Sequence, residues 1–237
     1  MISESEYFPD DQILIQKLYQ VNPELQDTYK IKRILSPLNE KQRNEILEIA
    51  ERKNYKHYLM IRMMLETGIR VNELANLVID QINFEAGVII IQSHDATKYY
   101  KSFKTKTVSS NREITLPKNL AKLIKSNLGP RKSGYVFESQ KKSRYTKNSV
   151  ITMINSYARQ CNSIPQRTNS KGNLTKDIGS HALRRTYASY LLQNNIPISE
   201  ISKLLGHSSI RTTMLYLFEI QPVDHDKIRK IVDKMNN

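Results

Sequence analysis

Cysteine and long apolar runs are both scarce in this 237-residue chain. Cys161 is its single cysteine, so the sequence offers no internal disulfide and no cysteine-based metal site. It contains no run of 18 apolar residues, which excludes a conventional membrane-spanning helix. The first residues, 1–6, are polar and acidic, unlike a signal or transit peptide. These absences predict a cytoplasmic protein in a reducing compartment, with no membrane partner.

Acidic residues are also scarce, and their scarcity is local. The chain has 37 basic and 23 acidic residues, a formal charge of +14, which favours a polyanionic partner such as nucleic acid. Residues 98–147 hold 14 basic and only two acidic residues, a net +12, with aromatic rings among them. Residues 1–36 have the opposite balance, four basic against six acidic. Cations interleaved with flat rings suit a phosphate backbone and its sugars or bases.

The first half of the chain predicts three helices followed by strands. Ser36 and Pro37 suit the N-cap and first position of one helix. Asn54 suits the N-cap of a second helix that ends at Gly68, and Asn72 suits the N-cap of a third. Strands are expected at 87–91, 99–106 and 112–116, with a polar turn at 108–111 between the last two. We therefore expect a three-stranded antiparallel sheet.

The second half predicts mostly helix. Helices are expected at 118–127, ended by Gly129, and at 149–160, 181–193, 199–205, 210–216 and 224–235. Asn195 follows one of them where a left-handed residue is common, and 162–179 looks like a long loop. The expected fold class is thus mainly α with a small antiparallel sheet, an α+β fold of one large domain.

Five residues have side chains suited to cleaving a phosphodiester without a metal. Such a reaction needs a nucleophile, cations for the charge on the non-bridging oxygens, and a proton for the departing oxygen. Arginine suits the charge because its planar fork holds two oxygens and stays protonated. Histidine or lysine suits the proton transfer. The candidates lie in the order Arg70, His181, Arg184, His207 and Tyr216.

The segments that carry these residues resemble the tyrosine recombinase, or phage integrase, family. They are ETGIRVNEL at Glu66–Leu74, HALRRTYAS at His181–Ser189 and LLGHSSIRTTMLY at Leu204–Tyr216. The resemblance spans roughly residues 37–220, nearly the whole catalytic domain of that family. It implies the family's catalytic-domain fold and a site-specific recombinase that cuts and rejoins DNA through a 3′-phosphotyrosyl bond, without metal, ATP or other cofactor.

The resemblance also assigns roles. Tyr216 is the implied nucleophile, and Arg70 and Arg184 would clamp the scissile phosphate. His181 would assist proton transfer at the tyrosine, and His207 would hydrogen-bond the phosphate. In the family an acidic residue at the position of Glu73 supports the first arginine structurally, and we assign it no catalytic role.

A hairpin lysine completes the family's set as general acid for the 5′-oxygen. Lys104 matches that lysine best, with Lys106 as the alternative. Other cations of the basic stretch are expected to contact DNA: Lys98, Lys101, Lys106, Arg112, Lys141, Lys142 and Arg144.

The resemblance leaves the ends of the chain outside the catalytic domain. Residues 1–36 are too few for the core-binding domain that family members commonly carry, so they are interpreted as a remnant or linker, and the chain as a fragment or a minimal enzyme. Weak, strongly salt-dependent DNA binding follows from that. Residues 221–237 are interpreted as a helical tail that docks on a neighbouring protomer or packs on its own core. Double-stranded DNA, a homo-tetramer on paired sites and accessory directionality factors are the implied partners.

Three other functions remain open from the sequence. A type IB topoisomerase shares the tyrosine chemistry but relaxes supercoils without exchanging sites. A non-catalytic DNA-binding relative would keep the basic surface and lose a catalytic side chain. A metal-dependent nuclease or transposase needs clustered carboxylates, for which Asp224, His225 and Asp226 are the nearest candidates.

Overall fold

The structure is a computed structural model that describes residues 37–93, 103–104, 111–168, 173–207 and 213. The chain divides into two units, Met1–Ile34 and Leu35–Asn237, and every described residue belongs to the second. Among the described residues, every helix is too short or too polar to cross a membrane.

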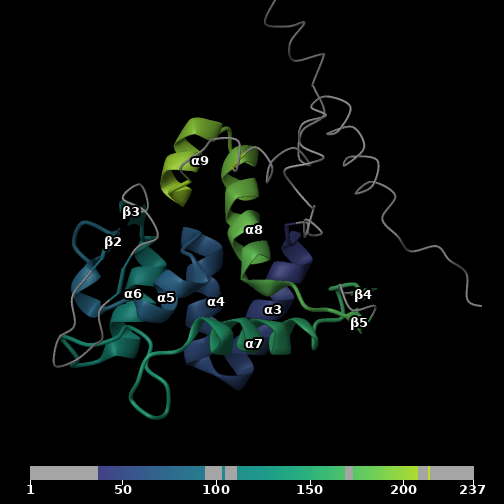
Figure 1. Ribbon diagram of the computed structural model, residues 1–237, viewed down its shortest axis with the longest axis horizontal. Helices are drawn as coiled ribbons and strands as arrows, with labels where there is room; N and C mark the ends of the chain where they lie inside the picture. Colours follow the sequence, from purple (N-terminus) through teal and green to yellow (C-terminus); the bar gives the residue numbers. More distant parts are fainter. Residues whose placement is uncertain (1–36, 94–102, 105–110, 169–172, 208–212, 214–237) are drawn as a thin grey trace, which may run out of the picture. The chain divides into compact units, whose positions relative to one another are not determined.

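The described unit is mostly helical, with short strands (Figure 1). Its helices are α3 (Glu40–Lys53), α4 (Tyr55–Thr67), α5 (Val71–Asn76), the 3₁₀ turn η1 (Ile79–Gln81), α6 (Lys118–Leu128), α7 (Lys147–Ala158), α8 (Gly179–Gln193) and α9 (Ile198–Leu205). Its strands are β1 (Ile82–Asn83), β2 (Val88–Ile91), β3 (Arg112–Thr115), β4 (Arg167–Thr168) and β5 (Leu174–Thr175). The expected class, mainly α with a three-stranded antiparallel sheet, is confirmed.

Helix α3 begins later than the sequence suggested. Its N-cap is Asn39, whose side chain accepts from the backbone N–H of Gln42 at 2.9 Å. The Gln42 side chain in turn accepts from the N–H of Asn39 at 3.1 Å, which completes a capping box. The prediction of a helix starting at Pro37 was therefore wrong, because the reciprocal cap fixes the start two residues beyond Leu38.

Helix α4 begins and ends as predicted, whereas α5 does not. Asn54 caps α4 and Gly68 ends it in the left-handed conformation. Helix α5 follows at once with Arg70 as its N-cap, so the predicted cap Asn72 lies inside the helix. Glu73 explains the shift, because its Oε2 accepts from the backbone N–H of Arg70 at 2.8 Å and satisfies an N–H that the helix itself leaves unpaired.

The sheet has the order β1-β2-β3, with both pairs antiparallel. Ile82 pairs with Ile89, and Ile89 with Ile114, so one buried row of isoleucines crosses all three strands. The two-residue strand β1 was missed by the sequence analysis. Of the predicted strand 99–106, only residues 103 and 104 are described, so that prediction and the turn after it remain open.

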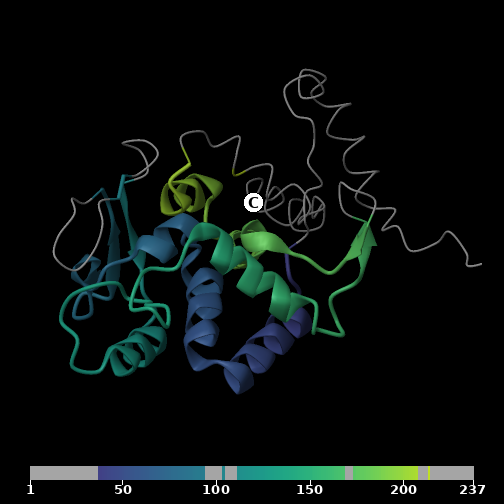
Figure 2. The same cartoon turned by 60° about the horizontal axis from the view of Figure 1, so that its bottom comes forward.

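Helices α4 and α8 lie at the centre of the core. Helix α4 packs against α3, α5, α6 and α8, and α8 also contacts α7 and α9; Figures 1 and 2 show α8 beside α4 with α9 at one end. Helix α4 contributes fully buried side chains, Leu59, Met60, Ile61, Met63 and Met64. Burial of such side chains supplies most of the stability of a helical core.

The last described elements agree closely with the sequence. Asn195 has the expected positive φ of 63° after α8, and α9 ends at Gly206 in the left-handed conformation. Within the expected loop 162–179, the two-residue strands β4 and β5 pair antiparallel. Of the predicted helix 210–216 only Thr213 is described, and it is helical. The predicted helix 224–235 lies outside the described residues.

Candidate active site

The C-terminal end of α9 gathers three arginines. Helix ends leave carbonyls without intrahelical partners and carry partial negative charge, which favours cations there. Three successive carbonyls each accept from a different guanidinium: Leu204 from Arg112 at 2.8 Å, Leu205 from Arg184, and Gly206 from Arg70 at 2.5 Å. The three arginines come from β3, α8 and the N-cap of α5, so one helix end draws distant parts of the chain together.

Arg184 is the most enclosed of the three. The residue is only 3% exposed, and besides Leu205 its guanidinium donates to the carbonyl of Gly68. It therefore ties the end of α4 to the end of α9 and has little conformational freedom. A rigid, buried cation is well placed to stabilise negative charge without reorganisation.

Glu73 pairs with the other two arginines. Its side chain is 5% exposed; Oε1 accepts from Arg70 at 2.8 Å and from Arg112 at 2.9 Å, and Oε2 accepts from Arg112 at 2.9 Å. Burial alone would raise the pKa of this carboxyl, but the hydrogen bonds and charges of Arg112 and then Arg70 outweigh it and lower the pKa to about 2. Glu73 is thus ionised at neutral pH and supports Arg70, as the resemblance implied.

His207 directly follows the helix end. Its Nε2 lies 3.4 Å from Nη2 of Arg184 and its Nδ1 lies 2.8 Å from Oγ1 of Thr213. Burial, followed by the charges of Arg184 and Arg70, lowers the pKa of His207 to about 3. The ring is therefore neutral at pH 7. Because the guanidinium can only donate, Nε2 accepts and Nδ1 carries the proton toward Thr213.

His181 lies in the first turn of α8, three residues before Arg184 and on the same helical face. Desolvation by the surrounding protein, then the charges of Arg184 and Arg185, lower the pKa of His181. The charge of Arg70 acts in the same direction on both histidines, and His181 itself contributes to the lowered pKa of His207. Both imidazoles therefore lie in the field of one arginine cluster.

Two glycines let the helix ends come this close. A Cβ on Gly206, where φ is +60°, would lie 2.9 Å from Cδ of Arg112. A Cβ on Gly68, where φ is +62°, would lie 2.5 Å from Cδ1 of Tyr187. Only glycine combines a positive φ with such approaches. The sequence marked Gly68 as a helix stop, but it carried no signal for this second role.

The structure brings together four of the six predicted catalytic residues, namely Arg70, His181, Arg184 and His207. Lys104 lies among the described residues and is exposed. Tyr216 lies outside the described residues, as does the alternative lysine, Lys106. Thr213 was missed by the sequence analysis; its position in the third segment is visible, but only the geometry reveals its hydrogen bond to His207.

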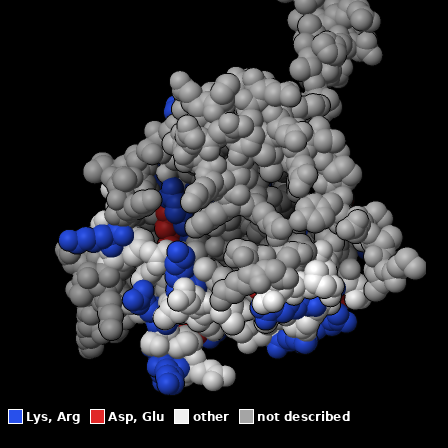
Figure 3. All heavy atoms as spheres, turned by 45° about the vertical axis from the view of Figure 1, so that its right-hand side comes forward, with Lys and Arg blue, Asp and Glu red and all other residues white. Residues whose placement is uncertain are grey.

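The predicted DNA-contacting residues divide into three groups. Lys98, Lys101 and Lys106 lie outside the described residues. Lys141 and Lys142 are exposed in the turn before α7, and Arg144 is half-buried and donates to the side chain of Asn76 at 2.7 Å. Figure 3 shows several Lys and Arg side chains, and few acidic ones, on one face of the described residues.

Arg112, also predicted to contact DNA, has a buried side chain. Its side chain is 6% exposed, and its Nε and both terminal nitrogens donate to Leu204 and Glu73. Such a side chain meets DNA only by giving up these partners. The basic composition of this stretch favoured a surface position for Arg112. The buried acceptors on Leu204 and Glu73 instead hold its side chain inside the protein.

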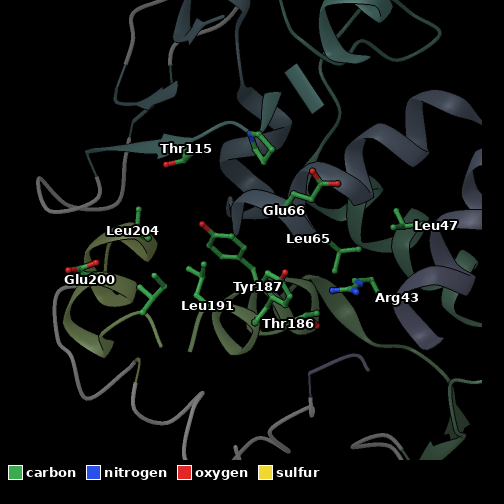
Figure 4. A pocket seen from close by; sticks show the side chains of 13 residues that line it. Arg43, Leu47, Leu65, Glu66, Thr115, Thr186, Tyr187, Leu191, Glu200 and Leu204 are labelled. Carbon is green, nitrogen blue, oxygen red and sulfur yellow. The ribbon is translucent and has the colours of Figure 1, made fainter. Parts of the chain in front are cut away.

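An apolar groove of about 570 Å³ is lined mainly by residues of α3, α4, α8 and α9, together with Thr115 and Pro117. Figure 4 shows Tyr187 near its middle, with Leu191 and Leu204 on one side and Leu65 and Glu66 on the other. None of the predicted catalytic residues lines it. It is therefore a feature separate from the arginine cluster, although Leu204 belongs to both.

The part of the chain that the structure describes holds no group of three or more His, Cys, Asp or Glu side chains arranged to bind a metal ion. Asp224, His225 and Asp226, the candidates from the sequence, lie outside it.

The chain is similar to several proteins named tyrosine recombinases. A tyrosine recombinase of Pseudothermotoga lettingae is 28% identical over 196 residues, covering 81% of this chain and 60% of the relative. Tyrosine recombinase XerA of Pyrococcus furiosus is 28% identical over 184 residues, covering 76% of this chain and 56% of the relative. The chain thus spans about 60% or less of the length of these relatives.

Solved structures agree on the fold. The Tn1549 transposon integrase in complex with transposon right end DNA superposes with a TM-score of 0.67 at 23% identity, covering 90% of this chain and 70% of that one. The catalytic domain of bacteriophage HP1 integrase gives a TM-score of 0.53 at 21% identity, covering 83% and 95%. Residues 37–219 match the phage integrase family, and since that match covers most of the chain, the chain belongs to this family.

Proposed function

We propose that this chain is the DNA-cleaving and rejoining part of a tyrosine-type site-specific recombinase, which acts through a 3′-phosphotyrosyl intermediate at Tyr216 without metal or ATP. The observation that carries the proposal is the convergence of Arg70, Arg184 and His207 at the end of α9. Family membership and the named relatives support it.

The arginines would hold the scissile phosphate. Arg70 is the more accessible of the two, with a side chain 32% exposed, and it would meet the phosphate first. Arg184 would face it from the buried side, and His207 would supply a neutral hydrogen-bonding group between them. Charge gained by the non-bridging oxygens as phosphorus becomes five-coordinate would be stabilised by these fixed groups.

The chemical step would be an in-line displacement. The phenolic oxygen of Tyr216 bonds to phosphorus, and the bond to the 5′-oxygen breaks. The phenolic proton passes to His181, and the 5′-oxygen takes a proton from Lys104, or from Lys106 if that lysine occupies the site. The phosphotyrosyl bond retains the energy of the phosphodiester, so attack by a 5′-hydroxyl reverses the step without ATP.

The lowered pKa of each histidine fits these roles. At pH 7 both imidazoles are neutral in the free protein, so one ring nitrogen of His181 is unprotonated and its lone pair can accept a proton. A bound phosphate adds negative charge beside the cations that lower these pKa values. Substrate binding would therefore raise the pKa of His181 and strengthen it as a base when it is needed.

Double-stranded DNA is the proposed substrate, with Lys141, Lys142 and the half-buried Arg144 as described residues that would contact its phosphates. Binding through such contacts releases counterions and is strongly salt-dependent. The Tn1549 integrase has been solved with transposon right end DNA and XerH with its difH substrate, which supports the same partner here. A homo-tetramer on paired sites and accessory directionality factors complete the proposal.

The tail from residue 221 is proposed to take part in assembly. Its apolar positions, Ile228, Ile231, Val232 and Met235, would dock on a neighbouring protomer. Deleting residues 222–237 should then abolish synapsis of two sites. Undiminished synapsis by the shortened chain would rule this part out.

A nicked suicide substrate tests the main proposal. The native chain should form a protein–DNA adduct stable in SDS, Tyr216→Phe should form none, and EDTA should make no difference. Loss of activity in EDTA, with no adduct, would instead indicate a metal-dependent nuclease. A two-site exchange assay run beside plasmid relaxation separates a recombinase from a type IB topoisomerase, because only the recombinase joins strands of different sites.

A further inference from the structure

We propose that Arg112 is a positioning residue that holds Arg70 and His207 in place for cleavage, although it touches neither the DNA nor the reacting atoms. The inference rests on the proposed function of the cluster, and it adds a strand residue to a site otherwise built from helix ends.

The first link runs through Glu73. Both terminal nitrogens of Arg112 donate to the two carboxylate oxygens at 2.9 Å, a bidentate pair that fixes the plane of the carboxylate. The oriented carboxylate then accepts hydrogen bonds from Nη1 of Arg70 at 2.8 Å and from the backbone N–H of Arg70 at 2.8 Å. Rotation of Glu73 would break both contacts to Arg70 together.

The second link runs through the end of α9. The remaining nitrogen of Arg112, Nε, donates to the carbonyl of Leu204 at 2.8 Å. The Arg112 side chain also lies directly beneath Gly206, since a Cβ there would come within 2.9 Å of its Cδ. The Arg112 side chain therefore packs against the turn that leads into His207.

Arginine is the one residue whose chemistry fits both links. Its planar fork reaches three acceptors, two on Glu73 and one on Leu204, in fixed directions. A lysine ammonium is a compact point charge that cannot serve both oxygens of the carboxylate and the carbonyl with the same geometry. Substitution by lysine should therefore keep the charge and lose the positioning.

The decisive experiment compares single-turnover cleavage at saturating DNA for the native chain, Arg112→Lys and Arg112→Met. We expect Arg112→Met to slow cleavage by about 100-fold, since misplacing reacting groups by about 1 Å has an effect of that size. Arg112→Lys should fall between the two, and the salt dependence of DNA binding should stay unchanged in both. Arg159→Met is the matched control, because Arg159 makes a similar bidentate pair with Asp177 on the surface; its rate should equal that of the native chain.

Two results would overturn the inference. An unchanged cleavage rate per folded molecule, with only the melting temperature lowered, would leave Arg112 a purely structural residue. A lower salt dependence with an unchanged rate at saturating DNA would make it a phosphate contact. If Arg112→Met does not fold, Arg112→Lys carries the test alone.

NMR titration of His207 separates this inference from the proposed function. The groups that face His207 include Arg184, Arg70, Arg112 and His181, so Arg112→Met should raise the pKa of His207 while Arg159→Met should not. If the native chain forms no adduct, the proposed function fails, yet this titration still reports on Arg112. Because Arg112→Lys keeps the charge, a pKa of His207 that stays at its native value in this variant would show that the ring has not moved and would rule out the positioning role in either case.

Discussion

The basic residues of this chain have two different environments. Arg70, Arg112 and Arg184 lie at the end of α9, where each donates to a named carbonyl and two of them pair with Glu73. Lys141 and Lys142, in the turn before α7, are exposed. The first group is held by acceptors supplied by the fold, whereas the second contributes charge to the surface. Composition alone treats the two groups alike.

The difference has an energetic consequence. In the described part of the chain, Arg70 and Arg112 share the carboxylate of Glu73, and Arg184 donates to carbonyls at helix ends, which carry partial negative charge. Keeping cations away from water is costly unless they are paired. Under the proposed function, a phosphate that enters the cluster would add negative charge beside these cations, whereas the exposed lysines would mainly attract DNA at longer range.

Glu73→Gln should have the largest effect on stability, because it removes the carboxylate that Arg70 and Arg112 share. We expect a loss of about 3 kcal/mol in the free energy of unfolding at pH 7, as for other broken buried ion pairs. Asp177→Asn, which removes the partner of the exposed Arg159, should cost less than about 1 kcal/mol. Urea denaturation measures both, and equal losses would contradict the distinction between the two environments.

The same variant should change how acid affects stability. The pKa of Glu73 is 4.5 in the reference state and about 2 in the fold, so its contribution is complete above pH 4.5 and is lost as the pH falls toward 2. The fold lowers the pKa of His207 from 6.5 to about 3. Between pH 6.5 and pH 3 only the unfolded chain binds this proton, so acid also lowers the free energy of unfolding through His207. Glu73→Gln should therefore reduce the fall in the free energy of unfolding below pH 4.5. The fall above pH 4.5, which comes from His207, should remain.

Gly206→Ala tests how tightly the Arg112 side chain packs against the end of α9. Alanine at a positive φ costs about 1 kcal/mol, and the added Cβ would also press on the Arg112 side chain. Gly179→Ala is the matched control, with φ of +62° and nothing within 4 Å of its Cβ. We expect Gly206→Ala to lose about 1 kcal/mol more than the control, in the usual range for overpacking. Equal decreases in melting temperature for the two variants would mean that the Arg112 side chain moves aside without cost.

The double variant Lys141→Gln with Lys142→Gln should have the smallest effect on the fold. Unfolding free energy should change by less than about 0.5 kcal/mol, as for ordinary surface substitutions. The dependence of log affinity for DNA on log salt concentration should become shallower by about 2, since each phosphate contact contributes about 1. Binding isotherms at several salt concentrations decide this, and an unchanged slope would remove both lysines from the DNA surface.

Local signals in the sequence account for much of the fold. Asn54 and Gly68 marked the ends of α4 because a capping side chain and a left-handed residue act within one turn. The start of α5 was placed wrongly, since the side chain of Glu73 satisfies the N–H of Arg70 in a way that competes with Asn72. Strand β1 was missed because two residues carry no periodicity, and only pairing with β2 reveals it.

The candidate site was predictable as a set of residues but not as a geometry. The spacing within the three segments identified Arg70, His181, Arg184 and His207. The sequence indicated Arg112 only as a DNA contact, because its burial depends on Glu73 and Leu204, which are distant in sequence and come close only in the folded chain. Thr213 and the packing role of Gly206 were hidden for the same reason.

The central claim is that the arginine cluster neutralises the charge of the scissile phosphate. Single-turnover cleavage by Arg70→Ala, measured on an ordinary substrate and on one with a neutral methylphosphonate at the scissile position, tests it most directly. We expect a loss of about 100-fold or more on the phosphate and a much smaller loss on the methylphosphonate, which has less charge to neutralise. An equal loss on both substrates would show that Arg70 does not act on that charge.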